Sequence, residues 1–133
     1  MAWTCETLAT ELLQSTALNI QLVNSNNVLI IKMNDYGDLQ VAISLTSRQM
    51  IVETSICPVS AIPEQAEFNR FLLCNQKMLP LSSVGISRLD GEEYYIVFGA
   101  LSLHSSIDDI LLEIVTLAEN ALGLAEIAES YCA

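Results

Sequence analysis

The feature that most constrains this chain is the segment from residue 106 to about residue 131. Apolar side chains recur in it at spacings of three and four residues, which predicts one long helix with a broad apolar stripe. Ser106 is placed to cap this helix, because its hydroxyl can accept a hydrogen bond from the amide of Asp109. The helix would span roughly 37 Å at 1.5 Å per residue, more than the core of a small domain needs. The stripe comprises Ile107, Ile110, Leu111, Ile114, Leu117, Ala118, Ala121, Leu122, Ala125 and Ala128.

The composition indicates a folded chain with one core. Of its 133 residues, 52% are hydrophobic and 16% are charged. A chain of this length can bury one good core, and it is too apolar to be disordered. We therefore expect a single α+β domain over residues 1–133.

The net charge narrows the choice of partners. Sixteen acidic and five basic residues give a formal charge of −11, which keeps an apolar chain soluble and repels phosphate backbones and anionic lipid surfaces. We expect no nucleic-acid partner, although the charge favours a basic protein segment.

The longest apolar run, residues 94–101, is too short to cross a bilayer, and no signal-like segment opens the chain. We therefore expect a cytoplasmic protein without membrane insertion. Glu113, Glu119 and Glu126 are expected on the solvated side of the last helix.

The N-terminal half predicts a helix followed by an antiparallel meander. The first helix is expected over about residues 4–17, with Trp3 anchored on the core just before it. Residues 19–35 alternate imperfectly around the cluster 24–27 and fit either one interrupted strand or two short strands. Residues 39–46 and 49–56 continue the meander with one apolar face.

A second helix and a hairpin precede the long helix. Pro63 fits the first turn of that second helix, and Pro80 ends it. Asp90-Gly91 is the strongest short-range signal of a two-residue hairpin turn, and it sets Arg88 opposite Glu93 and Ile86 opposite Tyr95. The predicted order is therefore helix, antiparallel meander, helix, β-hairpin and long C-terminal helix.

The four cysteines indicate neither a zinc site nor a disulfide framework. Cys5, Cys57, Cys74 and Cys132 are scattered without a CxxC pair, and the chain has one histidine. We expect four reduced thiols, with Cys57 and Cys74 in the core and Cys5 and Cys132 near the surface.

Candidate catalytic residues are few. His104 lies beside Ser105 and Ser106 and before Asp108, which are the residue types of a nucleophile system. Neighbours at a helix start rarely meet in the required geometry, so a loop histidine is the better interpretation. The adjacent glutamates 92–93 point to opposite faces of a strand. We therefore expect no catalytic residue, cofactor or metal.

Apolar side chains on both faces of the last strand predict a protein-binding surface. Tyr95 and Val97 point one way and Tyr94, Ile96 and Phe98 the other; the helices are expected to cover one face, which leaves the other for a partner. Periodic apolar residues are in the first place what folds a domain, so the same side chains also fit an ordinary core. The predicted partner-binding residues are Phe68, Phe71, Leu72, Tyr94, Ile96 and Phe98.

Two resemblances extend this prediction. The order of elements resembles the class I type III secretion chaperone fold, which implies a cytosolic homodimer that holds an extended segment of a client and has no enzymatic activity. Residues 79–102 (LPLSSVGISRLDGEEYYIVFGALS) and 105–122 (SSIDDILLEIVTLAENAL) look like the YjfI-like proteins, an uncharacterised bacterial family. Members of that family tend to be encoded near a phage-shock-protein-A-like protein, which implies a partner linked to envelope stress.

The sequence therefore predicts a non-enzymatic, chaperone-like, protein-binding module that forms a homodimer. The alternative is a small-molecule sensor with an apolar pocket between helices and sheet, because such pockets leave little trace in a sequence. An enzyme is third, since the chain offers few polar residues for catalysis.

Overall fold

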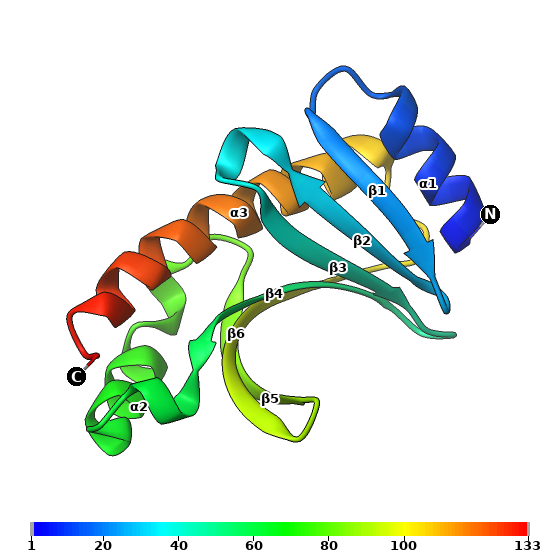
Figure 1. Cartoon of the computed structure of the whole chain (residues 1–133). Coiled ribbons are helices and arrows are strands. Elements are labelled where there is room, and N and C mark those ends of the chain that lie inside the picture. Colours follow the sequence, from blue (N-terminus) through cyan, green and yellow to red (C-terminus); the bar gives the residue numbers. More distant parts are fainter. Residues whose placement is uncertain (1, 133) are drawn as a thin grey trace.

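The computed structural model describes residues 2–132. Within them the chain forms three α-helices and one six-stranded antiparallel sheet (Figure 1). This is the predicted α+β order. The elements are α1 (Cys5–Gln14), β1 (Ile20–Ser25), β2 (Val28–Met33), η1 (Asn34–Tyr36), β3 (Leu39–Leu45), β4 (Met50–Pro58), η2 (Val59–Ala61), α2 (Gln65–Cys74), η3 (Gln76–Met78), β5 (Ser83–Leu89), β6 (Glu92–Leu101) and α3 (Ile107–Glu129).

The strands follow the order β1-β2-β3-β4-β6-β5, so β1 and β5 form the two edges of the sheet. Residues 19–35 form two strands and not one. Asn26 and Asn27 have φ angles of 51° and 63°, and they join β1 to β2 in a two-residue turn closed by the pair Ser25–Val28. Asparagine tolerates this left-handed backbone better than most residues.

The second hairpin confirms the predicted register. Asp90 and Gly91 have φ angles of 50° and 81°, as a two-residue hairpin turn requires. Arg88 lies opposite Glu93 and Ile86 lies opposite Tyr95. Because α2 is inserted before this hairpin, β6 pairs with β4, and β5 becomes the outer strand.

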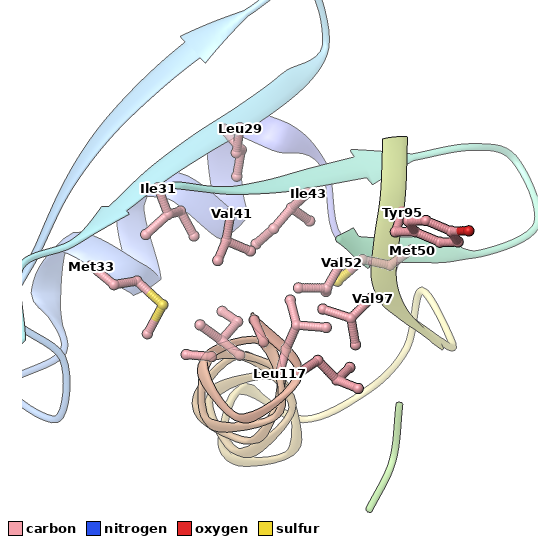
Figure 2. Packing of buried hydrophobic residues seen from close by; sticks show 14 of the residues in the cluster. Leu29, Ile31, Met33, Val41, Ile43, Met50, Val52, Tyr95, Val97 and Leu117 are labelled. Carbon is pink, nitrogen blue, oxygen red and sulfur yellow. The ribbon is translucent and has the colours of Figure 1, made fainter. Parts of the chain in front are cut away.

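The core forms between α3 and one face of the sheet. Figure 2 shows the inward side chains of four strands pointing toward α3 around Leu117. The helix α1 adds Leu8 and Leu12 to the same core, and α2 adds Phe68. The inward side chains include Leu29, Ile31, Met33, Val41, Ile43, Met50, Val52, Tyr95 and Val97.

Several local predictions need correction. The first helix ends at Gln14, three residues earlier than predicted, and Pro63 precedes the helix cap Glu64 instead of lying in the first turn. Cys5 is buried because it faces the core from the first turn of α1, whereas Cys74 is exposed at the end of α2. These two positions are the reverse of the prediction.

The remaining two cysteines differ less from the prediction. Cys57 is half-buried and Cys132 is exposed. All four cysteines are free thiols, as predicted.

The predicted stripe of α3 is wrong at one of its ten positions, and it omits one buried leucine. Leu122 is exposed, and Leu124 is buried in its place. Glu113, predicted on the solvated side, has only 5% of its surface exposed, while Glu119 and Glu126 are exposed as predicted.

Glu113 is buried because β6 has no side chain at Gly99. A Cβ atom built on Gly99 would overlap the Glu113 carboxyl group, and it would lie 3.1 Å from the carbonyl oxygen of Leu81. The Oε2 atom of Glu113 is buried without a hydrogen-bond partner among the described residues. Burial therefore raises the pKa of this carboxyl group above its ordinary value.

We predict that Glu113→Gln stabilises the protein at neutral pH. A carboxyl group with a raised pKa in the folded state binds its proton more tightly there, so stability falls as pH rises from the ordinary glutamate pKa through the raised one. The amide removes this loss and should raise the free energy of unfolding by about 1 kcal/mol. Urea unfolding at pH 4 and pH 8 measures the gain, which should be present at pH 8 and small at pH 4. The exposed Glu119→Gln is the control, and an equal gain in both variants would contradict the explanation.

The start of α3 gives a second prediction. Ser106 Oγ accepts a hydrogen bond from the amide of Asp109 at 3.1 Å, as the sequence predicts. Ser106→Ala should lower the free energy of unfolding by about 1 kcal/mol, the usual cost of losing a helix cap. Ser105→Ala is the matched control, because Ser105 accepts a hydrogen bond from the Trp3 indole through its backbone carbonyl and not through its side chain. Equal unfolding midpoints for the two variants would show that the cap contributes nothing.

Candidate partner-binding site

The six predicted partner-binding residues fall on two surfaces and in the core. Phe68 is completely buried. Its ring centroid lies 4.9 Å from that of Tyr95 in an edge-to-face arrangement and 4.7 Å from that of Tyr131. Phe68 is therefore part of the core and cannot contact a partner directly.

Phe71 and Leu72 line a groove between α2, η3 and α3. The groove has a volume of about 390 Å³. Its walls are apolar, and Asn75 and Asn120 are its polar lining residues. The Nδ2 group of Asn120 donates hydrogen bonds to the Pro80 carbonyl and to Ser82 Oγ, both at 2.9 Å, and so fixes the loop beside the groove. The other lining residues are Met78, Leu79, Val84, Gly123, Leu124 and Ile127.

Tyr94, Ile96 and Phe98 lie on the sheet face that points away from α3. Cross-strand partners share a face, and one row of partners runs across all six strands on this side. In Figure 1, α3 passes along the opposite face, and among residues 2–132 no helix covers this one. We call it the bare face. Its row of partners is Val23, Ile30, Ala42, Glu53, Phe98 and Ser83.

The bare face is hollowed at its centre. A depression of about 180 Å³ lies there, lined in part by Ile30, Leu89 and Ile96. Phe98 lies over Gly85 of β5, where a Cβ atom would meet its ring at 3.4 Å. Ile96 itself is buried. The concave surface is therefore mixed: Ile30, Leu89 and Phe98 are apolar, and Gln40, Glu53, Thr54 and Ser55 also line the depression.

The polar groups offer little catalytic chemistry. His104 is exposed on its loop, and the Ser106 hydroxyl is used as the helix cap. Burial raises the pKa of the Cys57 thiol, and the neighbouring Cys132 raises it further, so the reactive thiolate form is disfavoured. Burial and Glu6 have the same effect on the pKa of Cys5.

The described part of the chain lacks two further features. No group of three or more histidine, cysteine, aspartate or glutamate side chains in residues 2–132 is placed to hold a metal ion. None of the helices in this part of the chain combines the length and the apolarity needed to cross a membrane.

A side-chain contact at the free edge of β5 has no counterpart among the sequence predictions. The side-chain amide of Gln76 donates from Nε2 to the Val84 carbonyl and accepts at Oε1 from the Val84 amide, both at 3.0 Å. A second hollow of about 250 Å³ lies beside it, where Leu73 and Ile86 meet Tyr95. Sequence reasoning missed Gln76 because only the folded chain brings it to the strand edge.

Comparison with solved structures supports the fold. The crystal structure of YbjN from Escherichia coli aligns with a TM-score of 0.63 and 9% identity, covering 96% of this chain and 90% of that one. A chain in the crystal structure of the ExsC–ExsE complex aligns with a TM-score of 0.50 and 11% identity, covering 91% and 92%. At such low identities the likeness concerns the fold alone, and it confirms the predicted type III secretion chaperone-like α+β architecture.

Sequence comparison supports a family. The uncharacterised protein YjfI of Escherichia coli K12 is 66% identical over 131 residues, which cover 98% of both chains, and the protein from Escherichia coli O157:H7 gives the same values. The model of a family described as uncharacterised proteins conserved in bacteria (DUF2170) matches residues 2–132. The chain therefore belongs to the DUF2170 family, in agreement with its predicted resemblance to the YjfI-like proteins.

Proposed function

We propose that this protein is a non-enzymatic, cytoplasmic, chaperone-like module that acts as a homodimer and holds an extended segment of a partner protein. The observation that carries the proposal is the bare face. The three helices of residues 2–132 pack on one side of the sheet, and apolar side chains remain on the other side.

The side chains of the bare face favour burial by a partner. Burial of apolar surface lowers the free energy by about 25 cal/mol for each Å² removed from water. Contiguous apolar patches on a protein surface often mark interaction sites. Val23 is exposed, and Tyr94 and Phe98 are half-buried. A partner segment laid across the sheet would bury these side chains and enter the depression at Ile96.

The groove between α2 and α3 offers a second surface for the same segment. Extended segments bind by placing alternate side chains in apolar pockets. Phe71 and Met78 provide apolar walls. The Nδ2 groups of Asn75 and Asn120 already donate within the chain, which leaves their Oδ1 atoms as acceptors for a backbone. The formal charge of −11 favours a partner segment that carries basic residues.

The comparisons are consistent with a protein as the partner. ExsC, which shares this fold, was crystallised in a complex with ExsE. This supports a protein partner for the present chain without identifying it. The YjfI-like resemblance makes a phage-shock-protein-A-like protein the first partner to test.

A small-molecule sensor is the second candidate function. The volume of the groove, about 390 Å³, falls in the range of roughly 300–1,000 Å³ typical of ligand sites. A small molecule that copurifies with the protein and is lost on Leu124→Trp would favour this function.

We predict that Phe98→Asp weakens partner capture at least tenfold, about 1.4 kcal/mol. The substitution puts a charge on the bare face, where it would have to be desolvated on binding. The measurement is capture of the phage-shock-protein-A-like protein of the same bacterium by the immobilised protein, with circular dichroism to check folding.

The matched control is Leu13→Asp. Leu13 is an exposed leucine on α1, away from the bare face. Equal capture by both variants would rule out the bare face as the binding surface. Failure of the wild-type chain to capture any protein, together with a bound small molecule, would support the sensor instead.

A further inference from the structure

The outer edge of β5 has only a short stretch of free backbone. A two-residue turn closes the β5–β6 hairpin at the pair Leu89–Glu92, so backbone groups alternate along β5 between β6 and the open edge. Those of Val84, Ile86 and Arg88 point to the open edge. Val84 is already occupied by the Gln76 amide, and no other strand of the described chain pairs with Ile86 or Arg88 on that side.

Gln76 takes the place of a neighbouring strand at Val84. Its side-chain amide supplies one donor and one acceptor to the same residue, as the peptide groups of a paired strand would. An added strand can therefore pair with the free backbone groups of Ile86 and Arg88, but it has to end or turn away before Val84. The pairing edge is limited to two residues that are two positions apart.

We propose that this edge binds a second copy of the chain, with the two β5 strands antiparallel and centred on Ser87. Ile86 of each copy then lies opposite Arg88 of the other, and the four free backbone groups of each edge are paired. This interface rests on the homodimer of the proposed function and gives that homodimer a location.

The Gln76 contact selects this register. Centring the pair on Ile86 would place Arg88 opposite Val84, whose backbone groups are taken. Centring it on Arg88 would set two guanidinium groups directly opposite each other, which is destabilising, and would leave Ile86 facing Asp90 in the turn. Only the register centred on Ser87 pairs all the free groups of Ile86 and Arg88. In this register Asp90 of the second copy lies opposite Val84, so the second strand has to turn away there, at its own hairpin turn, to leave the Gln76 contact in place.

The charge around this edge differs from that of the whole chain. Two chains that each carry −11 repel one another. Residues 65–89 hold three of the five basic side chains, Arg70, Lys77 and Arg88, and one acidic side chain, Glu67, although Asp90, Glu92 and Glu93 follow in the same hairpin. Two copies that meet along residues 65–89 therefore keep most of their acidic side chains outside the contact.

Apolar surface at the edge would add to the stability of the proposed strand pairing. Leu73 is 70% exposed and Ile86 is 47% exposed, and both line the hollow of about 250 Å³ beside β5. A strand added at Ile86 would cover the open side of this hollow. Edge strands that must stay single are usually protected by proline, by bulges or by inward charges. The strand β5 has no proline and no register shift in its pairing, and its one charged side chain is Arg88, on the same face as Ile86.

The first test is the mass of the full chain in solution. Light scattering should give twice the 14.6 kDa of one chain, and Ile86→Pro should halve that mass. Proline removes an amide that points to the open edge, so the β5–β6 pairing is kept. Asn24→Pro is the matched control, because Asn24 faces the open edge of β1, the other edge strand, and this variant should stay dimeric.

The second test determines the register of the two β5 strands. In the proposed pair the two Ser87 residues face each other with Cα atoms about 4.5 Å apart, close enough for a disulfide. With the exposed Cys74 and Cys132 changed to serine, Ser87→Cys should crosslink two chains in oxidised glutathione. Ser83→Cys should not, because these residues would lie about 27 Å apart, eight residues at about 3.4 Å each.

The outcomes distinguish the β5 interface from partner binding at the bare face. A wild-type mass of one chain overturns the dimer, while partner capture through Phe98 can still be measured on the monomer. A dimer that persists in Ile86→Pro, together with no crosslink in Ser87→Cys, places the interface elsewhere. If the wild-type chain is itself a monomer, loss of partner capture in Ile86→Pro assigns the edge to the partner's own strand. If Ile86→Pro does not fold, the Ser87→Cys crosslink decides the question.

Discussion

The packing of α3 against the inward face of the sheet is the interaction on which the rest of this structure depends. Four strands contribute alternate side chains to it, and the helix contributes Ile110, Ile114 and Leu117 without exposing any of them. The other two helices contribute fewer buried residues, such as Leu8 and Leu12 of α1. Because burial of apolar surface is the main favourable term in folding, this contact organises the domain.

The same arrangement leaves the sheet covered on one side only. A layer of helices can bury one face of an antiparallel sheet and leave the other to water or to a partner. Here the open face carries Ile30 and Phe98 beside polar side chains such as Lys32, Gln40 and Glu53. The proposed partner site follows from this one-sided cover, whereas the proposed dimer contact follows from the position of β5 at the edge of the sheet.

Close packing also accommodates a buried acid. Glu113 lies in the apolar side of α3 because Gly99 leaves room for its carboxyl group against β6. An unpaired buried carboxyl group lowers stability, so the contact between Glu113 and Gly99 is not explained by folding alone. Among residues 2–132, no hydrogen-bond partner meets the buried Oε2 atom of this carboxyl group.

Local chemistry made much of the fold predictable. The Asp90-Gly91 turn, the Ser106 cap and the periodicity of α3 depend on neighbours within a few residues, and all three are confirmed. The positions of Cys5 and Cys74 were wrong, because their burial depends on which way a helix turns relative to a distant sheet.

For the functional surfaces too, some features depend on the local sequence and others on the tertiary structure. The sequence by itself determined the order of elements, the hairpin register and the apolar character of Tyr94, Ile96 and Phe98. Only the tertiary structure decided that Phe68 is core, that Glu113 is buried and that Gln76 reaches Val84. Periodicity assigns a side chain to one face of its own element, whereas burial and long-range hydrogen bonds depend on which element packs against that face.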